Sequence, residues 1–220
     1  MKIFVLHYSK LIERKKFIIN QFEKNNIIDY EFVENEPTED ELKLFDFNAN
    51  KYNLSNLNLN EVSLSVKHHY AFRQIAEKYD NALIFEDDVL LCNDFISILN
   101  KYLNVLPDDY DMFFISDGLG LHIDPSKIVP NKIIYEKDLY RSIPEGHGCT
   151  RCTDSIIMSK KCAINLCKLI DNPPCKIFLA IDYWLNVVAL FYYLKVYWAE
   201  PTFVKQGSKY LRLFNTSIKS

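Results

Sequence analysis

The 220-residue sequence is poor in glycine, with only 5 residues, and no Gly-rich loop of the kind that cradles phosphates occurs in it. It also lacks an excess of basic residues, because the formal net charge is −3 and the pI is near 6.0. No polybasic block and no stripe of alternating basic and aromatic residues is present. The composition therefore excludes a general electrostatic attraction to nucleic acid or to anionic lipid.

Long hydrophobic runs are also missing. The N-terminal apolar run ends at residues 7–10 without a small-residue cleavage site, so it is typical of a first strand and not of a signal peptide. The most apolar stretch near the C-terminus, 178–198, is interrupted by Asp182, Asn186 and Lys195, which is unlike a membrane span. We therefore expect a cytoplasmic protein with no membrane span.

Six cysteines in a chain without a secretory signal indicate reduced thiols, most of them packed as small apolar side chains. Cys149 and Cys152, with Cys162, Cys167 and Cys175 downstream, have a spacing at which thiolates can bind one zinc ion. A second closely spaced pair is missing, which favours the packed interpretation.

Strands and helices alternate along the chain. Apolar and β-branched runs predict strands at 2–7, 30–33, 82–85, 111–116, 132–135, 155–158 and 195–198. Helical periodicity predicts helices at 11–24, 61–79, 94–103, 160–169 and 181–191, whereas the asparagine-rich segment 48–60 indicates a loop. No repeat or linker divides the chain, so we expect one domain over 1–220, a three-layer α/β sandwich around a mixed, mostly parallel sheet.

Three acidic residues, Glu86, Asp87 and Asp88, follow the uninterrupted apolar strand predicted at 82–85. Such a strand is buried on both faces, and the carboxyl end of a strand of this kind is where α/β proteins bind ligands. Carboxylates crowded there repel one another unless a cation or hydrogen-bond donors compensate, and oxygen ligands suit Mg²⁺ or Mn²⁺. The alternative is an acidic turn that caps a helix or faces water; the apolar segment 89–91 that follows favours the metal.

Several short segments match, in order and spacing, the pattern of one known family. They are Phe4-Val5-Leu6 with Glu13-Arg14, Glu61-Val62 leading to His68, the run from Ala82 to Val89, Thr153 with 157–163, Ile181-Asp182, Pro201 with Gln206, and Ser217-Ile218. On these segments nearly the whole chain resembles glycosyltransferase family 25, which includes bacterial lipooligosaccharide galactosyltransferases and procollagen galactosyltransferases. The chain departs from the family pattern at Lys67 (usually Ser), Ser155 (Gly), Ile156 (Tyr) and Cys162 (Gly).

The resemblance implies a GT-A-type, Rossmann-like fold and a nucleotide-sugar donor, commonly a UDP-hexose such as UDP-galactose or UDP-glucose. It also implies a Mn²⁺-assisted (or Mg²⁺-assisted), inverting transfer to a hydroxyl of a glycan or of a hydroxylated protein. Glu86-x-Asp88 has the spacing of the Asp-x-Asp motif of such folds, which assigns Glu86 to the ribose and Asp88 to the metal, with Asp87 or Glu86 assisting.

Four further residues are candidates for contact with the nucleotide sugar. His7, Tyr8 and Arg14, at or after the end of the first strand, are placed to meet the uracil or the phosphates. His68 is a donor-site candidate through the resemblance alone, because a histidine within a helix is more often packed or hydrogen-bonded. His147, between two glycines, is a weaker candidate for the metal or the diphosphate.

An inverting transfer needs a base to accept the proton of the acceptor hydroxyl, and Asp182 is the candidate. The alternative for Asp182 is an N-cap of the helix at 181–191, which contributes about 1 kcal/mol without catalysis. The alternative for the whole chain is a catalytically silent glycosyltransferase-like module that binds a glycan or a protein. A homodimer is compatible with the sequence.

Overall fold

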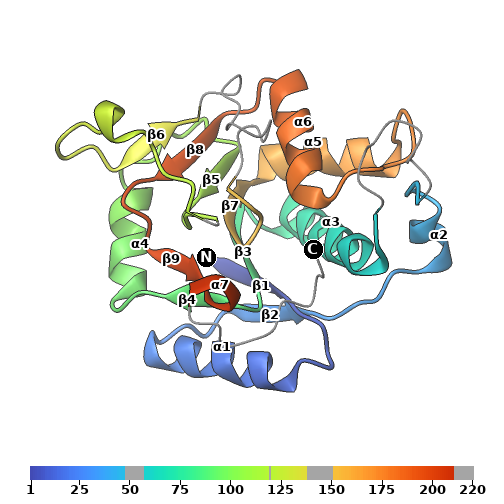
Figure 1. The fold of residues 1–220 in the computed structure, drawn as a ribbon, viewed down its shortest axis with the longest axis horizontal. Helices are drawn as coiled ribbons and strands as arrows, with labels where there is room; N and C mark the ends of the chain where they lie inside the picture. Colours follow the sequence, from blue (N-terminus) through green and yellow to red (C-terminus); the bar gives the residue numbers. More distant parts are fainter. Residues whose placement is uncertain (48–56, 119, 138–150, 211–220) are drawn as a thin grey trace.

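The computed structural model describes residues 1–47, 57–118, 120–137 and 151–210. A seven-stranded sheet crosses its centre in the order β2-β1-β3-β7-β5-β8-β6 (Figure 1). Its strands are β1 (Lys2–Leu6), β2 (Tyr30–Val33), β3 (Asn81–Glu86), β5 (Met112–Phe114), β6 (Ile134–Glu136), β7 (Ser155–Ser159) and β8 (Val196–Ala199). Only β7 and β6 run against the direction of the others, so the expected mixed, mostly parallel sheet is confirmed.

Alternate side chains of the strands enter two separate hydrophobic cores. Phe4, Ile84 and Phe114 belong to the core under α3 (Leu59–Lys78), α5 (Lys160–Asp171) and α6 (Ile181–Phe191). Val5 and Phe85 point to the other face and pack with residues of α1 (Ile12–Lys24) and α4 (Phe95–Leu103). Because each fully buried residue of this size contributes about 1.5–3 kcal/mol, the sheet is fixed on both faces and the three-layer sandwich is confirmed.

Helix α3 begins two residues earlier than predicted because Asn58 caps it. The Asn58 side chain accepts hydrogen bonds from the N–H groups of Asn60 and Glu61, and the Glu61 carboxylate accepts one from the Asn58 N–H in return. Reciprocal capping of this kind satisfies N–H groups that the first helical turn leaves without partners. The end of the loop predicted at 48–60 was therefore wrong for residues 59–60, while 48–56 lie outside the described residues.

A second, two-stranded sheet was not predicted. Strand β4 (Val89–Leu91), directly after the acidic triplet, pairs antiparallel with β9 (Val204–Gln206), and the short helix α7 (Gly207–Tyr210) follows. The remaining short elements are α2 (Glu39–Leu42) and the 3₁₀ helix η2 (Pro125–Lys127). The pairing of β4 with β9 brings the segment after β9 against the acidic triplet. Among the described residues, no helix is both long enough and apolar enough to cross a membrane.

Candidate active site

One edge of the central sheet collects polar and acidic residues from six strands. The edge is formed by the carboxyl ends of β2, β1, β3, β5 and β8, and by the beginning of the antiparallel strand β7. The residues at these positions are Glu34 after β2, His7 after β1, Glu86 to Asp88 at the end of β3, Thr153 and Asp154 before β7, Ser116 and Asp117 after β5, and Glu200 after β8. The acidic triplet is thus the middle of a longer polar edge.

Asp87 is held by two of the other predicted site residues. Its carboxylate is buried, Arg14 Nη1 donates to Oδ1 at 2.8 Å, and His7 Nδ1 lies 2.7 Å from Oδ2. Such charge-assisted bonds in a buried place hold the three side chains in one geometry. Asp87 therefore anchors Arg14 and His7, and its expected assistance to Asp88 at a metal stays a prediction.

Glu86 and Asp88 form hydrogen bonds with other residues than Asp87 does. Thr153 Oγ1 donates to Glu86 Oε1 at 2.8 Å, and Ser208 Oγ donates to Asp88 Oδ2. The N–H of Gly207 also donates to the carbonyl oxygen of Asp88 at 2.6 Å. Residues 207–208, placed by the pairing of β4 with β9, therefore fix the Asp88 side chain and backbone.

Asp154, a residue that was not predicted, completes the acidic cluster of Glu86, Asp88 and Asp154. It is fully buried, and Ser116 Oγ donates to its Oδ1 at 2.7 Å. Within the described part of the chain, Asp88 Oδ1 and Asp154 Oδ2 are buried carboxylate oxygens without a hydrogen-bond partner. Buried polar atoms are normally paired, so these two oxygens are acceptors that the described residues leave unused.

The acidic cluster is electrostatically costly in the absence of a cation. Burial raises the pKa of Glu86 well above its usual range, and the neighbouring Asp88 and Asp154 raise it further. Burial also raises the pKa of Asp88, although the hydrogen bond from Ser208 opposes this. For Asp154, burial is again the main cause and raises the pKa to about 7, with Asp88 and Asp117 adding to it. The three carboxyl groups therefore either retain protons or require a compensating positive charge.

The carboxylate oxygens of the acidic cluster provide some, but not all, of the ligands that a hard divalent cation such as Mg²⁺ needs. In the part of the chain that the structure describes, no group of three or more His, Cys, Asp or Glu side chains converges as a complete metal site. Mg²⁺ and similar ions at phosphate-transfer sites are, however, commonly bound by only one or two carboxylates, and substrate phosphates and waters fill the remaining positions. Asp88 and Asp154 match that smaller requirement.

A cavity of about 340 Å³ adjoins the acidic cluster through Glu86. Its walls include five of the predicted nucleotide-sugar residues, His7, Tyr8, Arg14, Glu86 and Asp87. Tyr8 is 39% exposed, so its ring is available to a ligand. The volume is at the lower end of the range for small-molecule sites, and leucine side chains supply apolar surface beside the polar groups. The structure therefore brings together the residues predicted from β1 and β3.

His68 is not part of this cavity. It is fully buried, its ring packs against that of Phe72 with centroids 5.7 Å apart, and burial lowers its pKa to about 3. A neutral, buried imidazole of this kind is a core residue, as the alternative interpretation predicted. Its neighbour Lys67 lines the cavity instead. The expectation that His68 contacts the donor is corrected accordingly.

Asp182 lies in the first turn of α6, but it is not the N-cap. The residue before the helix is Ala180, which makes no side-chain cap, and Asp182 Oδ1 accepts from the N–H of Tyr183 at 2.8 Å. The N-cap alternative was therefore wrong. Asp182 is also absent from the described residues that line the cavity. Its role as a base stays a prediction.

Arg151 and the residues around it form a second polar group that the sequence did not reveal. Arg151 is fully buried and donates to the carbonyl oxygens of Ser116 and Ala199 at 2.9 and 2.7 Å, and to Glu200 Oε2 at 2.8 Å. It thereby ties the ends of β5 and β8 together beside the acidic cluster. The sequence does contain a run of polar residues directly before the apolar strand β7. Once β7 is known to be antiparallel, this run is expected at the same edge of the sheet as the acidic triplet.

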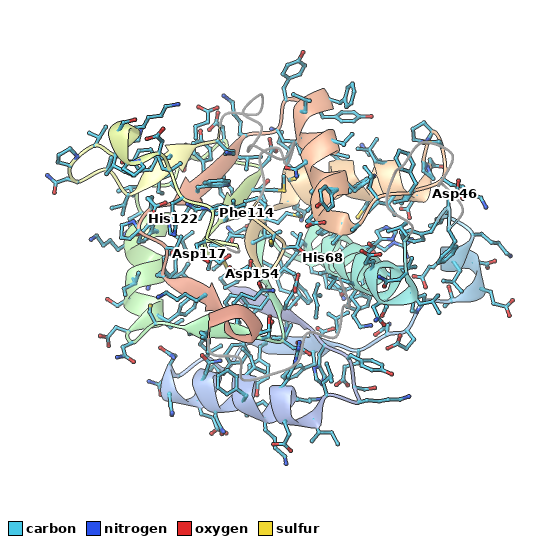
Figure 2. The ribbon with its side chains drawn as sticks, in the orientation of Figure 1. Asp46, His68, Phe114, Asp117, His122 and Asp154 are labelled. Atoms are coloured by element: carbon cyan, nitrogen blue, oxygen red, sulfur yellow. The ribbon has the colours of Figure 1, made fainter. Side chains whose placement is uncertain are left out.

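Figure 2 shows Asp117 and His122 in the segment after β5, Asp154 just before β7, and His68 apart from them on α3. His122 lies 3.1 Å from Glu200 Oε1 and 3.6 Å from Asp117 Oδ2. The residues predicted at 146–149, including His147 and Cys149, lie outside the described residues, as does the Ser217-Ile218 segment. The five described cysteines form no disulfide with one another.

Comparison of the sequence with models of known protein families identifies the family of this chain. The model of glycosyltransferase family 25, described as an LPS biosynthesis protein family, matches residues 1–185. This chain belongs to glycosyltransferase family 25. It is therefore a glycosyltransferase, an enzyme that takes a sugar from a donor and attaches it to an acceptor, and the family assignment made from the sequence is confirmed. No curated protein matches the chain.

Solved structures similar to this family 25 glycosyltransferase are distant. A glycosyltransferase involved in the glycosylation of the major capsid of PBCV-1 is 12% identical, with a TM-score of 0.48 over 94% of this chain and 92% of that chain. The bifunctional glycosyltransferase WbbM is 13% identical, with a TM-score of 0.48 over 89% of this chain and 38% of that one. The galactosyltransferase LgtC, in complex with donor and acceptor sugar analogs, is 10% identical, with a TM-score of 0.43 over 85% and 70%.

Proposed function

We propose that this glycosyltransferase is metal-dependent and transfers a hexose, galactose or glucose, from a UDP-sugar to a hydroxyl of a glycan or of a hydroxylated protein, with inversion. The observation that carries the proposal is the acidic cluster, which contains two unpartnered buried oxygens and adjoins a 340 Å³ cavity through Glu86. A buried anionic cluster next to a ligand-sized cavity matches a reaction in which a cation and a charged donor bind together.

The donor in this proposal binds in the cavity, with its diphosphate at the Glu86 end. Glu86 both lines the cavity and belongs to the acidic cluster, so it is the residue at which the two features meet. The exposed ring of Tyr8 offers an aromatic face to the base or the ribose. Arg14, fixed by Asp87, adds positive charge to the same wall.

Asp88 and Asp154 are the residues that would hold the divalent cation, Mn²⁺ or Mg²⁺. Their unpartnered oxygens provide the ligands, while Ser208 and Ser116 orient the other oxygen of each carboxylate. Hydrogen bonds to ligating groups of this kind set their orientation and are part of a metal site. When bound, such a cation supplies electrostatic stabilisation for the negative charge that develops on a departing diphosphate.

Asp182 is the base that we propose for the acceptor hydroxyl. It is part-buried, and it lies in the first turn of α6, on the same face of the sheet as α3, whose first half supplies cavity residues. A carboxylate in reach of the acceptor hydroxyl accepts its proton as the new bond forms.

A panel of nucleotide sugars tests the proposed function. We expect release of UDP from UDP-galactose or UDP-glucose in the presence of Mn²⁺, and none after chelation with EDTA. Asp88→Asn should remove this activity, whereas Asp40→Asn, at an exposed carboxylate on α2 that pairs with Lys43, should keep it. Failure of the wild-type chain to bind UDP with or without Mn²⁺ would favour the catalytically silent module instead.

A further inference from the structure

Lys67 stands out among the cavity residues because it is a buried lysine. Its side chain is only 4% exposed, yet it lines the cavity together with Ser63 and Glu36. Lysine is almost never buried without a compensating partner. A buried ammonium in the wall of a ligand cavity is therefore a feature that needs an explanation.

The three side chains form a closed set of hydrogen bonds, here called the Lys67 triad. Lys67 Nζ donates to Ser63 Oγ at 2.6 Å and to Glu36 Oε1 at 3.4 Å, and Ser63 Oγ donates to Glu36 Oε2 at 3.2 Å. Burial lowers the pKa of Lys67, whereas the negative charges of Glu36, Asp87 and Glu34 favour its protonated form. The triad thus joins α3 to the segment after β2 at the cavity wall.

The Lys67 triad presents a hydrogen-bond donor to the cavity. An ammonium has three N–H groups, and among the described residues the acceptors bonded to Lys67 are Ser63 and Glu36, so one N–H group is left over. Both carboxylate oxygens of Glu36 already accept a hydrogen bond within the triad. Because the Glu36 side chain is half-exposed, water can donate to the remaining lone pairs of these oxygens. The ligand atom that satisfies the triad is accordingly an acceptor.

The position of the triad on the sheet edge indicates which part of the donor it meets. Glu36 follows β2, which is separated from β3 by β1, so the ends of β2 and β3 are about 10 Å apart at the usual spacing of neighbouring strands. In the proposed binding mode the diphosphate lies at Glu86 and Asp88, and the nucleoside extends along the sheet edge from β3 towards β2. The base then reaches the triad. The phosphates remain at the acidic cluster.

We infer that Lys67 is a specificity residue that donates a hydrogen bond to the 4-carbonyl oxygen of the donor's uracil and so selects uracil over cytosine. The inference rests on the proposed nucleotide-sugar donor. Cytosine places an amino group where uracil has its 4-carbonyl oxygen. An amino group there would set two donors against each other, since neither it nor the ammonium can accept. Guanine shares the carbonyl chemistry, whereas adenine shares that of cytosine.

Titration calorimetry with UDP and CDP in the presence of Mn²⁺ tests the inference, because the two ligands differ only at the base. Wild type should bind UDP about 10- to 100-fold more tightly than CDP, the range expected for one hydrogen bond to a charged group. Lys67→Met keeps most of the side-chain volume without the donor, so it should lose this preference mainly through weaker UDP binding. Lys67→Gln, whose amide can either donate or accept, should bind both ligands within a few-fold.

The control is Lys43→Met, at an exposed lysine directly after α2 that pairs with Asp40, which should keep the wild-type preference. Equal weakening of UDP and CDP in Lys67→Met would overturn base selection and indicate a contact with the phosphates or a structural role. An unchanged UDP affinity in a folded Lys67→Met chain would remove Lys67 from the binding site. If wild type binds neither nucleotide, the proposed function itself fails, and this outcome is distinct from the other two.

Discussion

Replacing Asp154 with asparagine should make the metal-free protein more stable at neutral and alkaline pH, although it removes a residue of the active site. Asp154 is fully buried, it accepts one hydrogen bond from Ser116, and its second oxygen has no partner among the described residues. Asparagine has nearly the same shape and its carbonyl oxygen can keep the bond from Ser116. The substitution therefore removes the buried negative charge and little else.

The size and direction of the effect follow from the pKa of Asp154. Burial raises it from the ordinary value of 3.8 to about 7 in the folded chain, so the folded state holds the proton more tightly than the unfolded state. The group does not destabilise the fold below about pH 4, and its cost grows as the pH rises to about 7. The difference between the two pKa values corresponds to about 4 kcal/mol of stability lost above neutral pH, which Asp154→Asn should largely recover.

Urea unfolding in EDTA, followed by tryptophan fluorescence near pH 4 and near pH 8, measures this difference. We expect Asp154→Asn to match wild type near pH 4 and to exceed it by up to about 4 kcal/mol near pH 8. Asp40→Asn, at a carboxylate that is 91% exposed, should follow wild type at both pH values. A variant that is less stable than wild type near pH 8 would refute the electrostatic reasoning.

Three further substitutions separate the roles of the site residues. Arg14→Met leaves the buried Asp87 carboxylate without its main cation and should cost about 3–5 kcal/mol in urea unfolding, whereas Lys43→Met at an exposed pair should cost at most about 1 kcal/mol. Asp88→Asn should lower Mn²⁺-dependent UDP release at least about 100-fold with the fold intact, and activity near that of wild type would remove Asp88 from the metal site. Asp182→Asn should leave UDP affinity unchanged and lower transfer to the acceptor by about 100-fold or more, and an unchanged transfer rate would return Asp182 to a structural role.

The part of the site that could be predicted best from the sequence is the part that depends on local sequence patterns. An apolar strand followed by Glu86, Asp87 and Asp88 identifies both a central strand and the edge of the sheet to which the triplet belongs. The structure places His7 and Arg14, two of the residues predicted from the first strand and helix, beside the triplet. These residues come from β1 and β3, whose directions follow from the β-α-β pattern. The directions of the strands in the other half of the sheet, β7, β5, β8 and β6, do not follow from such a pattern.

Asp154 was missed because it precedes its strand. Residues before a parallel strand lie at the opposite edge, and only the antiparallel direction of β7 brings Asp154 next to Glu86 and Asp88. The placement of Ser208 depends on the pairing of β4 with β9, two three-residue strands far apart in the chain, for which no local pattern exists. Long-range pairing of short strands is decided by tertiary packing.

The choice between Lys67 and His68 could not be made from periodicity. Residues 65–69 of α3 are all buried, so neither polar position stands on an obviously exposed face. One residue is about 100° of rotation around a helix, enough to turn one side chain to the cavity and the next into the core. The capping residues that set where α3 starts do not determine this rotation.

Binding of Mn²⁺ to the chain in the presence of UDP, followed by electron paramagnetic resonance, tests the central claim most directly. The account predicts one tightly bound Mn²⁺ per wild-type chain, its loss in Asp88→Asn, and its retention in Asp40→Asn. Absence of bound Mn²⁺ in wild type with UDP present, or equal binding by Asp88→Asn, would contradict the claim that the buried carboxylates of the acidic cluster hold a cation for the leaving diphosphate.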